Sequence, residues 1–258
     1  MSAREKRTSP ARVGPKRASS FVPNSRFNPA TKSATYSAEF TRKFFAAQGA
    51  RNNQLIADAL ARLAKIEKGE GDYKEDEPFI VRGSSQSFNG ARLDLADRRL
   101  SAETRAPRKF IRGDGSTTTQ VVPELLPATA NPDDLDRLRS TSHDTTVRHF
   151  LSFLSMRTTA DYAVTKNGIN GIEWRSTANS APGNVEGVTV PTLVVTGSCG
   201  GHMLTNEITY DHSAAKDKEI VVIEGGNHNL APCKPEFGDT TKRAFDYVDT
   251  WLIKAGRF

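Results

Sequence analysis

Hydrophobic residues recur at helical spacing in the first half of the chain and gather into continuous runs in its last third. Apolar positions three and four residues apart predict amphipathic helices over 37–48, ended by Gly49, and over 53–68. The stretch 82–120 mixes charge, Gly and Ser without a period and is interpreted as an irregular excursion. We therefore expect a helical cap or lid region over residues 35–160.

Two further helix starts fall inside this region. Asn131 and Pro132 precede two aspartates, which is the composition of a helix N-terminus. Ser142 is expected to cap a helix that ends near Met156. Residues 157–188 carry no clear period, and we expect them to form loops.

Two runs of β-branched and aliphatic residues, 190–196 and 219–224, predict strands buried on both faces. A helix is predicted between them over 204–216, and an amphipathic helix follows over 239–254. The order strand, helix, strand, helix is typical of an α/β unit with parallel strands. We therefore expect residues 161–258 to belong to the α/β class, as part of a doubly wound parallel sheet.

Basic charge is concentrated in residues 1–43, where ten lysines and arginines face two glutamates. The whole chain has a formal net charge of +6, so the remainder is slightly acidic. Residues 1–34 also lack apolar periodicity, and we expect a disordered basic leader there. A basic arm can contact nucleic acid or an anionic surface. No nucleic-acid motif accompanies these charges, so nucleic acid is not an expected partner.

The hydropathy pattern gives no sign of a membrane segment. No apolar run approaches the roughly 18 residues of a transmembrane span. The basic start is not followed by the apolar stretch of a secretory signal. We therefore expect a soluble, cytoplasmic protein without a membrane partner, and no pattern indicates its oligomeric state.

His228 has the strongest chemical context in the sequence. It follows the second predicted strand on the turn Gly225-Gly226-Asn227. Loops at the carboxyl ends of parallel strands are where α/β sheets hold their sites. A neutral imidazole there can accept a proton from a hydroxyl and later return it. The alternative is a turn histidine that only bonds a loop carbonyl.

The order of these motifs resembles the C-terminal portion of the α/β-hydrolase superfamily. The similarity lies in the run 190–197, the strand and turn 223–228, and the closing helix 240–253, and it covers about residues 186–258. It implies the C-terminal part of a doubly wound parallel-sheet α/β-hydrolase fold with a helical cap. It also implies hydrolysis of an ester or related acyl bond with His228 as general base. A small ester-like molecule would be the substrate, and no cofactor is implied.

The acid of the triad does not stand at its usual place in this sequence. In the superfamily an Asp commonly lies three residues after the Gly that ends the first of these strands, and here that position is Gly200. Glu207 and Asp211 are the nearest carboxylates and are the candidates for orienting the imidazole. The alternative is that both are solvated helix residues.

The nucleophile is also missing, because the sequence contains no G-x-S-x-G motif. The segment 197–201 fits G-x-C-x-G, which makes Cys199 a rival nucleophile, since a thiolate at a helix N-terminus has a lowered pKa. Cys199 is otherwise a small buried side chain, and its spacing from Cys233 leaves open whether the two pair. We expect a truncated hydrolase without its Ser nucleophile. The alternative is a non-catalytic remnant that binds a small molecule or a partner.

Metal ligation is the other chemistry that these histidines and cysteines offer. The spacings among Cys199, His202 and His212 match no common zinc pattern. No metal is therefore expected.

Overall fold

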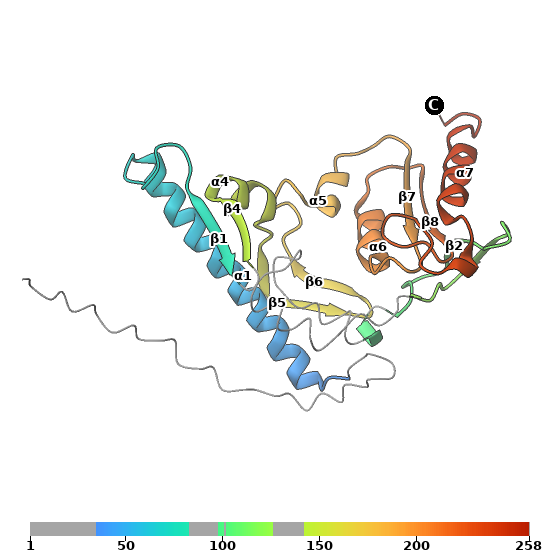
Figure 1. Ribbon diagram of the computed structural model, residues 1–258, viewed down its shortest axis with the longest axis horizontal. Coiled ribbons are helices and arrows are strands. Elements are labelled where there is room, and N and C mark those ends of the chain that lie inside the picture. The colour runs from blue at the N-terminus through green and yellow to red at the C-terminus, as the bar shows by residue number, and fades with distance from the viewer. Residues whose placement is uncertain (1–34, 83–97, 101, 126–141, 258) are drawn as a thin grey trace, which may run out of the picture.

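The computed structural model describes residues 35–82, 98–100, 102–125 and 142–257 (Figure 1). These residues form a mixed α/β structure with three small sheets. The predicted basic leader and the predicted helix start at 131–134 lie outside the described residues.

One long helix, α1 (Ala38–Glu67), replaces the two helices predicted for this region. It begins at Ser37, whose hydroxyl accepts a hydrogen bond from Phe40 N at 3.1 Å. The prediction of a stop at Gly49 is wrong, because this glycine serves a close contact instead. Thr158 Oγ1 donates to Gly49 O at 3.2 Å. A Cβ at position 49 would lie 3.0 Å from Thr158 Oγ1. The missing side chain lets a strand approach the helix.

Two antiparallel strand pairs pack along α1 (Figure 1). β1 (Pro78–Arg82) pairs with β4 (Ser142–Thr146), and β5 (Thr158–Thr165) pairs with β6 (Gly168–Ile172). The helix predicted from Ser142 to about Met156 is helical only over Val147–Leu154, because Ser142–Thr146 is a strand, and the prediction of loops over 157–188 is wrong where β5 and β6 lie. Short polar strands such as β4 are specified by pairing with β1, a contact between distant segments that periodicity does not reveal. The helical turns α4 (Val147–His149) and Phe150–Leu154 connect β4 to β5, and α5 (Ala181–Val185) lies between β6 and the C-terminal unit.

The C-terminal unit is a four-stranded sheet in the order β3-β2-β8-β7. The two predicted strands are present as β7 (Thr192–Gly197) and β8 (Lys218–Ile223), which run parallel. α6 (Met203–His212) crosses between them, and α7 (Thr240–Leu252) closes the chain, as predicted. The α/β class of this unit is therefore confirmed.

The inner strand β2 (Arg108–Ile111) and the edge strand β3 (Thr117–Gln120) come from the stretch interpreted as irregular. That interpretation is wrong for this part of the stretch. β2 has four residues and runs parallel to β8, more than a hundred residues further along the chain. The short 3-10 helix Arg98–Leu100 precedes it, and another, Pro235–Phe237, precedes α7.

Helices cover both faces of this sheet, with α6 on one side and α7 on the other (Figure 1). Successive residues of β8 alternate between the faces. Val222 packs with Met203 of α6, whereas Val221 and Ile223 pack with Ala244 of α7. β8 is thus buried on both faces, which explains its continuous apolar sequence.

α6 also joins the sheet to the N-terminal half. Its Leu204 and Ile208 share a buried cluster with Phe45 of α1 and Val164 of β5. The predicted boundary between residues 160 and 161 falls inside β5. Among the described residues, no helix has both the length and the apolarity needed to cross a membrane.

The buried carboxylate of Glu77 secures the turn between α1 and β1, and it makes stability depend on pH. It accepts hydrogen bonds from Asp72 N at 2.8 Å and from Arg62 Nη2 at 2.7 Å. These two bonds, the backbone one first, hold the pKa of Glu77 below its usual range. A pKa lowered by folding stabilises the protein above the unfolded pKa, and this stabilisation is lost as the pH falls through the folded value.

We therefore predict that Glu77→Gln lowers the free energy of unfolding at pH 7, and that the deficit shrinks between about pH 5 and pH 3. Urea denaturation of both proteins across this pH range measures the difference in their free energy of unfolding. Glu70→Gln, which changes an exposed carboxylate, is the control and should follow the parent protein. A deficit that stays constant from pH 7 to pH 3 would contradict the prediction.

Candidate functional site

His228 lies in the loop that follows β8, at the carboxyl edge of the sheet. β7, β8 and β2 run parallel, so their carboxyl ends meet at this edge. The side chain is exposed. The structure thus places this imidazole where the sequence pattern put it, after a buried strand and on the rim of a parallel sheet.

The loop around His228 is shaped by the side chain of Asn227. Its Oδ1 accepts hydrogen bonds from Asn229 N at 2.8 Å and from Ala231 N at 3.1 Å. Asparagine commonly folds a turn in this way, because its side chain replaces a backbone acceptor. Residues 227–231 therefore form a tight loop of defined shape on which His228 is carried outward.

The loops after β7 and β8 touch directly. Cys199 N donates to Gly226 O at 2.8 Å. A Cβ at position 197 would lie 2.0 Å from Gly226 O, so only glycine fits at the end of β7. The two loops therefore form one continuous rim.

A disulfide between Cys199 and Cys233 ties the same two loops together. Cys199 is 3% exposed, and its sulfur is bonded to Cys233, so it has no thiolate to offer in this structure. The prediction of Cys199 as a rival nucleophile is wrong for this state of the protein. The question of whether the two cysteines pair, which their spacing left open, is answered by the structure.

The neighbour of His228 is a second imidazole, that of His202, which immediately precedes α6. The ring centroids are 4.6 Å apart and the ring planes are inclined by 55°. Within the described residues, the His228 side chain makes this ring contact and no hydrogen bond to a carboxylate. The partner of His228 at the rim is therefore a second imidazole, and the expected partner was a carboxylate.

Glu207, a predicted acid partner, is fully buried and bound to arginines. Its carboxylate accepts hydrogen bonds from Arg108 Nε at 2.7 Å and from Arg105 N at 2.9 Å. The other predicted partner, Asp211, is half-exposed and also contacts Arg105, with Arg108 Nη2 at 3.8 Å. The expectation that either acid orients His228 is therefore wrong.

The direction of α6 explains this outcome. The helix starts at the carboxyl edge and runs back toward the amino ends of the strands, as a crossover between parallel strands must. At 1.5 Å per residue, Glu207 lies about 6 Å and Asp211 about 12 Å along the axis from Met203. Both carboxylates are carried away from the edge that holds His228.

An imidazole–carboxylate pair does occur at the far end of α6. His212 Nδ1 lies 2.8 Å from Glu186 Oε1, and Arg175 contacts the same carboxylate. The bond with His212, followed by that with Arg175, lowers the pKa of Glu186 below its usual range. Sequence reasoning missed this pair, because Glu186 follows α5 and no motif links it to the end of α6. His212 is the last residue of α6, where an imidazole can stabilise the C-terminus of the helix.

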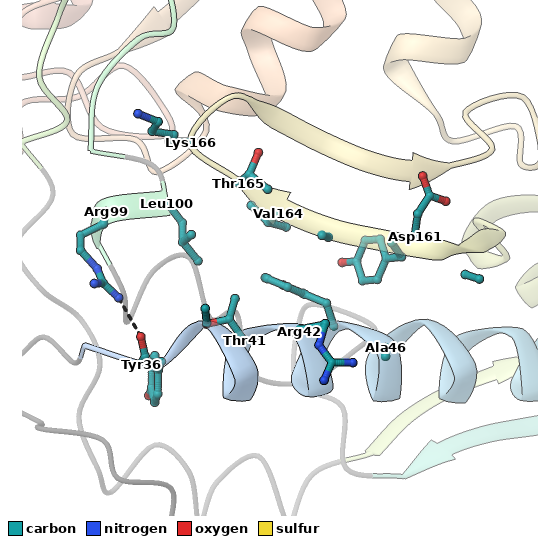
Figure 2. Close-up of a pocket in the computed structure, with 15 residues that line it drawn as sticks. Tyr36, Thr41, Arg42, Ala46, Arg99, Leu100, Asp161, Val164, Thr165 and Lys166 are labelled. Carbon is teal, nitrogen blue, oxygen red and sulfur yellow. Dashed lines mark hydrogen bonds between the residues drawn. The ribbon is translucent and has the colours of Figure 1, made fainter.

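A hollow among the described residues lies elsewhere, between the first half of α1 and β5 (Figure 2). It is a groove of about 750 Å³ with mostly apolar walls. Phe45, Tyr162 and Leu100 contribute to these walls. At one end Arg99 Nη2 donates to Tyr36 O at 3.0 Å (Figure 2). None of the four predicted site residues lines this groove.

Comparison of the chain with family models, with curated proteins and with solved structures gave no match.

The buried contacts of Glu207 predict a structural role that can be measured. Removing one partner of a buried ion pair leaves the other charge uncompensated and costs about 3 kcal/mol or more. We predict that Glu207→Gln lowers the free energy of unfolding by about that amount. Chemical denaturation measures the loss, and Glu173→Gln, at an exposed position, is the control. Equal stabilities of the two variants would be incompatible with this role.

Proposed function

We propose that the C-terminal unit is α/β-hydrolase-like and hydrolyses an ester or related acyl bond at its carboxyl edge, with His228 as general base. The observation that carries the proposal is the position of His228. It is an exposed imidazole on the loop after β8, where the loops of two parallel strands meet. Sites in open α/β sheets commonly lie at this edge. The substrate would be a small ester-like molecule.

The chemistry available at this rim is general-base hydrolysis. His228 accepts a proton from water while the water oxygen bonds to the acyl carbon. The bond from that carbon to the alkoxy oxygen then breaks, and the imidazolium returns the proton to the leaving oxygen. A positioned base of this kind contributes roughly 10²–10⁴-fold. Since no carboxylate among the described residues orients the ring, we expect the lower part of this range and a preference for activated aryl esters.

We predict that the protein hydrolyses p-nitrophenyl acetate, and that His228→Ala lowers kcat/KM tenfold or more. Release of p-nitrophenolate, followed by absorbance, measures the rate. His149→Ala removes another exposed imidazole, one that stacks on Phe153, and should leave the rate unchanged. If His228→Ala and His149→Ala hydrolyse the ester at the parent rate, His228 is not the base.

A second candidate function is the binding of a small molecule without catalysis, and the groove between α1 and β5 favours it. Its volume of about 750 Å³ lies within the range of small-molecule sites. The apolar walls suit an acyl or aryl group, and the lining has three cationic residues, Arg42, Arg99 and Lys166, against the one carboxylate of Asp161. The occupant expected on this basis is an amphipathic anion.

We predict saturable binding of 1-anilinonaphthalene-8-sulfonate, detected by its fluorescence, at this groove. Ala46→Leu adds bulk to the wall and should weaken the binding fivefold or more. Ala50→Leu, one helical turn further along α1 and outside the groove, is the matched control. Equal binding to both variants would place the dye elsewhere and remove the support for this candidate.

A further inference from the structure

Two imidazoles from separate loops face each other at the carboxyl edge, and neither the sequence spacing nor the proposed hydrolysis accounts for the pairing. From this geometry we infer that His202 and His228 form a chelating site for a divalent transition-metal ion. The ion would bind one nitrogen of each ring, and water would fill its remaining positions.

The separation of the rings fits this role. Two imidazoles bound to one metal ion, each with a metal–nitrogen distance of about 2.0–2.1 Å, have ring centroids roughly 4.5–5.5 Å apart. The centroids of His202 and His228 are 4.6 Å apart. Chelation requires the two side chains to rotate until one nitrogen of each ring points at a common position.

The backbone under both rings is held in place. His202 O accepts hydrogen bonds from Asn206 N and Thr205 Oγ1, both at 2.9 Å, at the start of α6. The loop of His228 is folded around Asn227, and the Cys199–Cys233 disulfide ties the two loops together. A site whose ligands are already close loses little conformational entropy on binding. The disulfide thereby acts as the clamp that keeps the two imidazoles apposed.

The donor set identifies the class of ion. Imidazole nitrogen suits Zn²⁺, Ni²⁺ and Cu²⁺, whereas Mg²⁺ and Ca²⁺ require oxygen ligands. Cu²⁺ should bind most tightly, because divalent affinities rise along the series to copper. Ligating imidazoles must be neutral, so the affinity falls in acid.

The site does not depend on ester hydrolysis. A metal bound to His228 occupies the lone pair that a general base needs, so the two roles exclude each other. His202→Ala separates them, because it removes a ligand and leaves the proposed base.

The test is titration of the full chain with Cu²⁺ at pH 7.5 without thiol reductants, followed by calorimetry and by electron paramagnetic resonance. We expect one site per chain with micromolar affinity and nitrogen hyperfine structure from two imidazoles. His202→Ala and His228→Ala should each weaken binding tenfold or more, with loss of the two-nitrogen signal. His149→Ala is the matched control and should bind like the parent protein.

Equal Cu²⁺ affinity of the parent protein, His202→Ala and His228→Ala would show adventitious binding only and would overturn the proposal. His202→Gln and His228→Gln repeat the test if an alanine variant unfolds, as judged by circular dichroism. Cu²⁺ binding at the parent affinity in both glutamine variants would likewise show adventitious binding only and would overturn the proposal.

Discussion

The buried carboxylate of Glu207, held between Arg105 and Arg108, is the interaction on which the C-terminal unit depends. A charge without water is costly unless partners surround it, and here two guanidinium groups and a backbone N–H do so. Arg108 is the first residue of β2, and Arg105 lies just before it. The contact therefore fixes the position of β2 against α6, and β2 in turn pairs with β8.

This arrangement decides which chemistry is left at the carboxyl edge. The two acids predicted as partners of His228, Glu207 and Asp211, contact arginines instead, because α6 runs away from the edge that carries the histidine. Cys199 has no free thiol, because its sulfur is bonded to that of Cys233. His202 and His228 lie together at the rim, and both the proposed base and the proposed metal site follow from their position.

The strands and helices predicted in the last third of the chain are correct, because β7 and β8 are continuous apolar runs and α6 and α7 have a clear period. The apolar run of β8 also predicted that His228 lies in the loop after a buried strand. β2 and β4 could not be predicted in this way, since each is short, carries polar residues and pairs with a segment far along the chain. The continuity of α1 through Gly49 depends on the approach of Thr158, which no local pattern contains. The partner of His228 could not be predicted either, because helix direction, and not sequence distance, determines which side chains meet.

Glu207 is bound to Arg108 and lies away from His228, and a double-mutant cycle measures both relations at once. The free energy of unfolding would be determined for Glu207→Gln, Arg108→Gln and His228→Gln and for the two double variants that contain Glu207→Gln. We predict a coupling energy of about 1 kcal/mol or more between Glu207 and Arg108, and additivity within about 0.5 kcal/mol between Glu207 and His228. Coupling of Glu207 to His228 as strong as its coupling to Arg108 would contradict the account.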